Sequence, residues 1–534
     1  MTETATKKIS LKAQSAWLLF AKIVGYGFTI ILPLLIVRFL SQEKVGTYRE
    51  AFQVIANAAS ILPLGFSMSA YYFLARETER RAAAIFNILI FNFTGGALAF
   101  LTLFFYPQLL GNIFHNEELV RLAPVIGIVI WLWLFSAFLE TAAIANQEAK
   151  LATIFIISAQ LSKTLLMVMA VTLFSSVESI IYAALIQSAI QTIVLLIYLH
   201  SRFPHFWREF TLKFFRRQAA YALPFGFIGI LYTLQNDIHN YFVGYRFSEA
   251  EFAVYAYGCF QLPLIFMLSE SVTSVLIPRV SELQLINNKD EIIRLTARAM
   301  QKLALFYFPL YIFFLITAPT FITTMFGENY AASVPIFRIN LTFLPFLILI
   351  TDPIVRAYQE LSRILLIVRV FLLTGMIAAL FFGISHFGLT GMIAVVLAVY
   401  LIEKAVAETI ILKKIGIGRR HFYLLENVWK TAVVAVLAGA FTYLVYTEAK
   451  EFMTGIGAKF SAAVFSAVKP SVAQFFDGGL ILFAAALVFT PIYFAGAYYW
   501  NLIDDEEKQT LRNATGKLKI FFKKDIIGNQ ESQI

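Results

Sequence analysis

Long apolar runs separated by short polar segments are the feature that most constrains this chain. Each run approaches the roughly 20 residues that a helix needs to cross the hydrocarbon core of a bilayer. Of the 534 residues, 59% are apolar and 14% charged, whereas a soluble domain carries roughly 25% charged residues. We therefore expect an all-α integral membrane protein with about fourteen transmembrane helices. The predicted spans are 15–40, 50–74, 84–110, 121–146, 151–174, 178–200, 218–244, 251–278, 302–325, 334–358, 362–385, 389–412, 428–447 and 478–500.

The basic residues predict the orientation of these spans. If the N-terminus is cytoplasmic, most of the 43 lysines and arginines fall in the loops that face inward. Cytoplasmic loops of membrane proteins carry this excess of positive charge. We expect a multi-pass protein of the cell inner (plasma) membrane with both termini in the cytoplasm. The net charge of +10 then indicates contact with membrane lipids on that side rather than with nucleic acid.

Two short sequences recur at a distance of six spans. Arg38-Phe39-Leu40-Ser41 returns as Arg246-Phe247-Ser248, and Phe114-His115-Asn116-Glu117 returns as Phe326-Gly327-Glu328-Asn329. A shift of six spans preserves orientation, so the repeats are parallel, and transporters often place their substrate path between such halves. The predicted domains are an N-terminal six-helix lobe (1–213), a C-terminal six-helix lobe (214–415), and two additional helices with a basic cytoplasmic tail (416–534).

Catalytic motifs are missing from the sequence. It contains no G-x-x-x-x-G-K-[ST] loop, no H-E-x-x-H pair and no G-x-S-x-G elbow, and Cys259 is its single cysteine. The predicted outer loops are too short for the catalytic domain of a membrane glycosyltransferase or polymerase, and the role of the longest one, 448–477, stays open. We expect no enzyme activity, no cofactor and no metal. The glycosyltransferase or polymerase is kept as the alternative of another class.

Several short motifs, in order and spacing, are similar to a known family. They are Arg38-Phe39-Leu40 with Val45-Gly46-Thr47-Tyr48, Leu64-Gly65-Phe66, Ala222-Leu223-Pro224 and, most specifically, Met325-Phe326-Gly327-Glu328-Asn329-Tyr330-Ala331-Ala332. Over residues 10–415 the chain resembles the polysaccharide-biosynthesis (O-antigen type) lipid-linked oligosaccharide flippases. That family belongs to the multidrug/oligosaccharidyl-lipid/polysaccharide exporter superfamily. Ala253 and Ala145-Asn146-Gln147 depart from its usual pattern, which leaves the substrate branch open.

The resemblance implies two parallel six-helix lobes in a V around a cavity that opens alternately to each side. It also implies a cargo, a polyprenyl-diphosphate-linked oligosaccharide for O-antigen or exopolysaccharide synthesis. A polysaccharide polymerase and glycosyltransferases are further candidate partners. Two alternatives share the fold: a lipid II flippase for cell-wall synthesis and a cation-coupled drug extruder.

Ionisable residues inside predicted spans are the candidate site residues, because a charge at membrane depth is costly unless it faces a cavity or a partner. The cations Lys22, Lys163 and Arg369 are predicted to bind substrate. In the hypothesis weighed most closely, Lys22 and Arg369 hold the diphosphate; the rival view pairs Arg369 with Asp352. Asp237 lies in a polar run and is predicted to line the same cavity.

Three further residues are predicted to act in coupling or gating. Glu270 and Asp352 lie in the inner halves of their spans, where an acid can take up a proton or a sodium ion. Arg49 lies at the outer start of the second span, beside Glu50. We expect a salt bridge there, either between these two neighbours or between the lobes.

Overall fold

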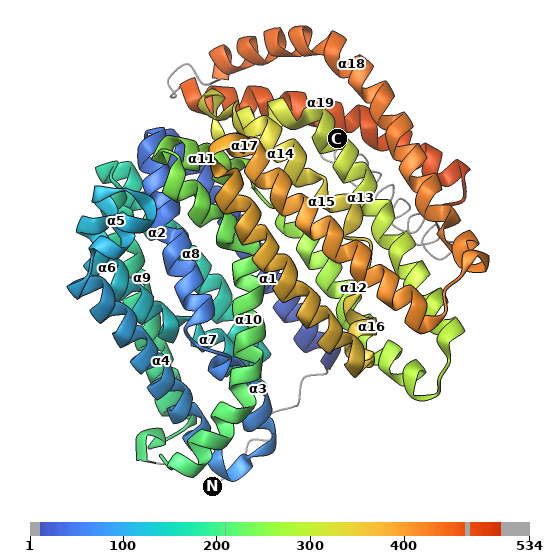
Figure 1. The fold of residues 1–534 in the computed structure, drawn as a ribbon. Helices are drawn as coiled ribbons and strands as arrows, with labels where there is room; N and C mark the ends of the chain where they lie inside the picture. The colour runs from blue at the N-terminus through green and yellow to red at the C-terminus, as the bar shows by residue number, and fades with distance from the viewer. Residues whose placement is uncertain (1–10, 209, 465–469, 504–534) are drawn as a thin grey trace, which may run out of the picture. The chain divides into compact units, whose positions relative to one another are not determined.

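The computed structural model describes residues 11–208, 210–464 and 470–503, and within these ranges all regular structure is helical (Figure 1). This confirms the predicted all-α class. The α-helices are α1 (Leu11–Phe39), α2 (Gln42–Ile61), α3 (Phe66–Arg76), α4 (Arg81–Phe105), α5 (Gln108–Phe114), α6 (Glu117–Ser136), α7 (Phe138–Ala145), α8 (Ala149–Phe174), α9 (Val177–Arg202), α10 (Leu212–Arg246), α11 (Glu249–Gly258), α12 (Pro263–Leu285), α13 (Lys289–Phe326), α14 (Ser333–Leu341), α15 (Phe343–Phe346), α16 (Asp352–Ala357), α17 (Gln359–Ile415), α18 (Glu426–Val464) and α19 (Pro470–Tyr499). Short 3₁₀ turns are η1 (Thr78–Arg80), η2 (Phe206–Arg208), η3 (Glu328–Tyr330) and η4 (Arg419–Leu425).

Within the described ranges, 11 helical segments are long and apolar enough to cross a membrane. The predicted spans 218–244, 251–278 and 334–358 are not among them. The first lies in the continuous helix α10, whose polar residues lower its hydropathy. The other two were expected as single helices and are instead broken, between α11 and α12 and into α14, α15 and α16. Broken helices are tolerated at membrane depth where other protein covers the backbone. Counting these three segments as crossings, the fold is consistent with about fourteen transmembrane helices.

A tight bend divides the predicted span 50–74 into α2 and α3. Leu64 and Gly65 both have positive φ, 43° and 79°. A Cβ on Gly65 would lie 2.3 Å from the carbonyl oxygen of Ala222 in α10. Glycine is therefore required at position 65 for two reasons: the positive φ, and the close approach of α10 to this bend.

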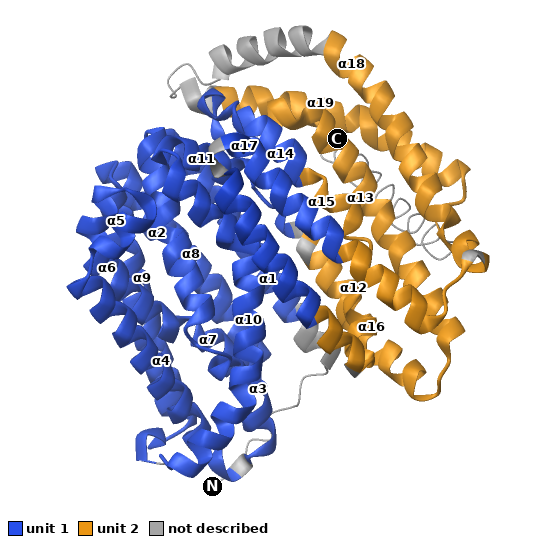
Figure 2. Ribbon diagram, in the orientation of Figure 1, with its two compact units in different colours: residues 1–263, 322–340, 366–403 blue, residues 264–321, 341–365, 404–534 orange. Residues whose placement is uncertain are grey.

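The chain forms two compact units (Figure 2). Unit 1 contains residues 1–263, 322–340 and 366–403, and unit 2 contains 264–321, 341–365 and 404–534. These boundaries follow internal contacts and differ from the repeat-based lobes, which stay a prediction. One reason is that α10 and α11 pack on α2 inside unit 1, although the repeat assigns them to the second lobe.

Each unit has its own apolar core. In unit 1, Phe66, Phe138, Leu195 and Leu199 are buried where α3, α7 and α9 meet. In unit 2, one core joins α12, α13, α16 and the end of α17, and another joins α18 and α19. Many large apolar side chains point outward instead, with Phe174 at 69% and Phe382 at 76% exposure among them, as expected where lipid replaces water as solvent.

The predicted outer segment 448–477 is mostly helical. The helix that contains the predicted span 428–447 continues to Val464, and α19 begins at Pro470. Residues 465–469 lie outside the described ranges.

Candidate functional site

A line of polar side chains joins α2 to α10 within unit 1. Asn240 donates to Gln53 over 3.2 Å, Asn57 donates to the Tyr241 hydroxyl over 3.1 Å, and Ser60 and Thr233 share a hydrogen bond of 3.0 Å. From Gln53 to Ser60 of α2, the partner on α10 moves back from Asn240 to Thr233, so the two helices run antiparallel. Polar contacts between membrane helices contribute modestly, about 0.6 kcal/mol each. These three hydrogen bonds therefore add only modestly to the packing of α2 on α10.

A polar pocket of about 240 Å³ lies at the predicted outer end of this contact. Its lining residues are Arg49, Gln53, Asn236, Asp237, His239, Asn240, Phe252, Ala256, Cys259, Phe260 and Gln261. The structure thus brings together Arg49 and Asp237, which the sequence predicted separately as gating and substrate-binding residues. Asp237 accepts a hydrogen bond from Gln53 and interacts electrostatically with Arg49.

Arg49 does not form the expected salt bridge with Glu50. Its guanidinium lies over the ring of Tyr257 in α11, 5.4 Å from the ring centre. Glu50 is fully buried, and Asn116 donates to one of its carboxylate oxygens over 2.9 Å. Neighbours on a helix point in different directions, which explains why these two side chains find separate partners.

Lys163 is a half-buried cation near the middle of α8. Its ammonium lies 4.5 Å from the centre of the Trp133 ring and 5.9 Å from that of Phe52. The two rings meet edge to face at 6.2 Å. None of the described carboxylates forms an ion pair with this ammonium. Aromatic faces attract a cation but do not neutralise its charge.

Arg369 has a counter-charge within the chain. Its Nη2 and Nε both donate to Glu403 Oε1, over 2.8 and 3.0 Å, and Gln235 of α10 donates to the other oxygen of Glu403. Arg369 and Glu403 belong to the two halves of α17, which meet at Gly388 with φ 59°. The rival pairing of Arg369 with Asp352 is replaced by this one.

The remaining predicted residues lie elsewhere. Lys22 is half-buried in α1 and interacts electrostatically with Glu140 of α7. Glu270 is exposed on α12 of unit 2. Asp352 begins α16 and accepts a hydrogen bond from Arg356 over 2.8 Å in a largely exposed ion pair. Neither acid lines the pocket of Arg49 and Asp237.

Sequence reasoning missed Glu403 and the two aromatic partners of Lys163. Glu403 carried a signal, because it is an acid within the apolar run 389–412. Phe52 and Trp133 carried none that separates them from the other aromatic residues of the chain.

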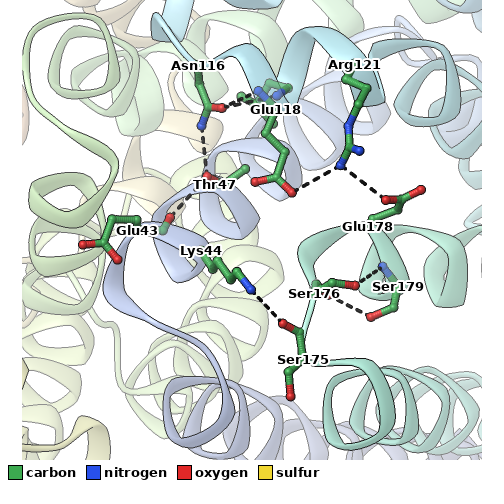
Figure 3. A network of polar contacts seen from close by, with 11 residues as sticks. Glu43, Lys44, Thr47, Asn116, Glu118, Arg121, Ser175, Ser176, Glu178 and Ser179 are labelled. Atoms are coloured by element: carbon green, nitrogen blue, oxygen red, sulfur yellow. Dashed lines mark hydrogen bonds and ion pairs between the residues drawn. The ribbon is translucent and has the colours of Figure 1, made fainter.

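The predicted outer loops of unit 1 are tied together by side chains (Figure 3). Lys44 donates to the carbonyl oxygen of Ser175 over 3.1 Å, and Arg121 bridges to Glu178 over 3.3 Å. Asn116 caps α6 by accepting from the backbone of Glu118 and also donates to Thr47.

A longer connection reaches the second repeat. Arg38, at the end of α1, donates to the carbonyl oxygens of Thr324 and Met325 over 2.9 and 3.2 Å. Gln42 donates to that of Asn329 over 2.7 Å. The end of α1 and the start of α2 are therefore hydrogen-bonded to the end of α13 and to η3 within unit 1.

Comparisons with known proteins identify both a family and a fold. The model of a family described as polysaccharide biosynthesis protein matches residues 35–335. No curated protein sequence gives a significant match.

Among solved structures, the lipid II flippase MurJ in its inward closed conformation has a TM-score of 0.63 at 14% identity. The match covers 90% of this chain and 99% of MurJ. A MOP superfamily transporter from Pyrococcus furiosus has a TM-score of 0.56 at 18% identity, covering 78% and 99%. A multidrug resistance MATE family transporter in an outward-facing conformation has 0.55 at 18% identity, with the same coverage. At these identities the likeness concerns the fold.

Proposed function

The chain belongs to the polysaccharide biosynthesis protein family, and from this premise we propose that it flips a polyprenyl-diphosphate-linked oligosaccharide across the inner membrane by alternating access. Family and fold are those of membrane transporters and flippases. A diphosphate with a sugar chain cannot cross hydrocarbon unaided, because each unpaired charge or hydroxyl costs several kcal/mol there. The lipid tail stays in the bilayer while the polar headgroup passes along the protein.

The observation that supports this cargo is the environment of the Lys163 ammonium. A cation at membrane depth is expensive, and this one is held by two aromatic rings without a carboxylate from the described part of the chain. An anionic cargo would supply the missing counter-charge at the moment of passage. A phosphate oxygen accepting from an ammonium forms the strong, charge-assisted kind of hydrogen bond.

The other candidate binding groups fit the same proposal in different roles. The Asp237 carboxylate can accept hydrogen bonds from sugar hydroxyls. The amides of Gln53 and Asn240 can both donate to such hydroxyls and accept from them. Lys22 stays a candidate for the diphosphate, whereas Arg369 is already engaged by Glu403. Glu270 and Asp352 remain candidates for ion coupling.

The test compares two lysines of the same helix. Lys163→Gln should reduce flipping of a lipid-linked oligosaccharide in proteoliposomes by about 10- to 100-fold, the effect of losing one charge-assisted contact of about 1.5–3 kcal/mol. Lys163→Arg, which keeps the charge, should retain part of the activity. Lys150→Gln is the matched control, because Lys150 also lies over a ring, 5.9 Å from the centre of Trp17, but is exposed in the first turn of α8. Equal losses from Lys163→Gln and Lys150→Gln would refute the proposal.

Two alternatives of the same class fit the fold equally well. A lipid II flippase would also need a cation for its diphosphate, and the match to MurJ over 90% of the chain favours it. A cation-coupled drug extruder would use an acid in its cavity, and the place of Asp237 in the pocket favours that. The lipid-linked sugar that accumulates on the cytoplasmic leaflet after depletion distinguishes all three.

We further propose that both termini face the cytoplasm and that a polysaccharide polymerase and glycosyltransferases act before and after the flipping step. The orientation rests on the distribution of lysine and arginine. The partners follow from the cargo, which such enzymes must build and then consume.

A further inference from the structure

A second polar pocket, of about 210 Å³, lies within unit 2 on the predicted cytoplasmic side. It is formed by the first turns of α13 and by the 3₁₀ segment η4, which links the end of α17 to α18. Its lining residues are Asp290, Ile293, Arg294, Arg420, His421, Tyr423 and Leu424. It shares no residue with the pocket of Arg49 and Asp237.

The local structure holds η4 against α13. The Gln301 side chain of α13 donates to the carbonyl oxygen of Leu424, a lining residue of the pocket. The backbone N–H of Gly418 donates to His421 Nδ1 over 3.2 Å. A neutral imidazole that accepts at Nδ1 carries its proton on Nε2, so His421 has a donor left for a ligand.

The charge balance of the pocket favours an anion. Its lining contains two guanidinium groups, Arg294 and Arg420, and a single carboxylate, Asp290. Arg294 is bridged to Glu291 at 3.7 Å with its side chain 55% exposed, and a pair of that kind contributes at most about 1 kcal/mol. An incoming phosphate can therefore replace this partner at little cost.

The surroundings place the pocket at the level of lipid headgroups. Phe422, Tyr423 and Trp429 are exposed by 58%, 65% and 55%. Exposed aromatic residues of this kind gather at the interface between membrane and water. Basic pockets between helices on the cytoplasmic side bind the headgroups of anionic lipids.

We infer that this pocket binds the headgroup of an anionic phospholipid of the phosphatidylglycerol type. Its phosphodiester accepts from Arg294 and Arg420, and one glycerol hydroxyl donates to Asp290. The apolar side chains Ile293 and Leu424 cover the less polar part of the headgroup. This site is independent of the proposed cargo, since it lies in unit 2 and needs no lipid-linked sugar.

The experiment titrates the purified full chain, in a neutral detergent, with three probes: phosphatidylglycerol, phosphatidylcholine and inorganic phosphate. Thermal unfolding reports binding, because a ligand that binds the folded state raises Tm. We expect phosphatidylglycerol to raise Tm at lower concentration than the other two. In the Arg294→Gln/Arg420→Gln variant, the phosphatidylglycerol concentration at half-saturation should rise at least about tenfold, because the charge-assisted contacts are lost.

The matched control is Arg279→Gln. Arg279 is exposed in the same unit and pairs with Glu282 three residues away, as Arg294 pairs with Glu291, but it lies outside the pocket. It should leave the titration unchanged, and both variants should unfold at the wild-type Tm without lipid. An equal effect of Arg279→Gln, or an equal response to inorganic phosphate and phosphatidylglycerol, would overturn the inference. Unchanged flipping with lost lipid response would leave the proposed function standing.

Discussion

Lys163 and Arg369 are two cations at membrane depth that the sequence presents in the same way and the structure treats differently. Arg369 is bound to Glu403 at 2.8 Å, and a third side chain, Gln235, completes the cluster. Lys163 lies over Trp133 and Phe52 and has no ion pair with any described carboxylate. One charge is satisfied by the fold, and the other is only partly compensated.

The difference separates a structural cation from a candidate binding cation. A half-buried charge that already has its counter-ion connects helices, here the two halves of α17 and α10. A cation held by ring faces keeps its capacity to form a strong bond with an anion. The comparison therefore predicts that variants of Arg369 act mainly on stability and variants of Lys163 mainly on transport.

The largest expected effect on stability is that of Glu403→Gln. The substitution keeps the size of the side chain but leaves the half-buried Arg369, whose side chain is 33% exposed, without its counter-ion. The loss is expected to be about 2 kcal/mol, below that of a fully buried pair. Unfolding of the purified protein by denaturant measures the loss.

Two variants check this reading of Glu403. Removing both charges, with Glu403→Gln and Arg369→Gln together, should restore most of the stability. Arg356→Gln is the control, because Arg356 binds Asp352 at the same 2.8 Å but with side-chain exposures of 62% and 49%. Such an exposed pair contributes about 0–1 kcal/mol. A loss from Arg356→Gln as large as that from Glu403→Gln would mean that burial does not set the difference.

The sequence revealed the two cations but not their partners. Lys163 and Arg369 stand out because each interrupts an apolar run, and the same rule would have identified Glu403. The rings over Lys163 come from α2 and α6, and their approach depends on how three helices pack. The breaks in 251–278 and 334–358 did carry a signal, because α12 begins at Pro263 and α16 has Pro353 in its first turn. A proline interrupts the hydrogen bonding of a helix, but hydropathy alone does not register it.

An effect of intermediate size, on the opening of unit 1, is expected from the hydrogen bonds of Arg38 at its predicted outer end. If alternating access opens unit 1 at this end, the bonds from Arg38 to Thr324 and Met325 would break. Arg38→Ala removes the two bonds that reach Thr324 and Met325, each contributing about 0.5–1.5 kcal/mol. The open state should therefore be populated about tenfold more.

Cys259 makes this opening measurable. It is the single cysteine of the chain and lines the pocket of Arg49 and Asp237. In Arg38→Ala, a membrane-impermeant maleimide added from outside should label Cys259 about tenfold faster than in the wild type. Arg121→Ala is the control, because its ion pairs join loops within the first repeat alone. Equal labelling of the two variants would show that Arg38 does not close the pocket.

The smallest effect expected is that of Lys163→Met on stability. Losing the contact with Trp133 and Phe52 costs about 0.5–2 kcal/mol, but removing a charge from membrane depth relieves a desolvation penalty of opposite sign. Methionine fills nearly the same space and keeps favourable contacts between its sulfur and the rings. The net change in the free energy of unfolding should stay within about 1 kcal/mol, measured under the conditions used for Glu403→Gln. A loss of the size expected for Glu403→Gln would mean that Lys163, like Arg369, holds the fold together, and the distinction between the two cations would fail. Near-wild-type stability with lost transport would instead establish that the chain carries an uncompensated charge because its cargo needs one.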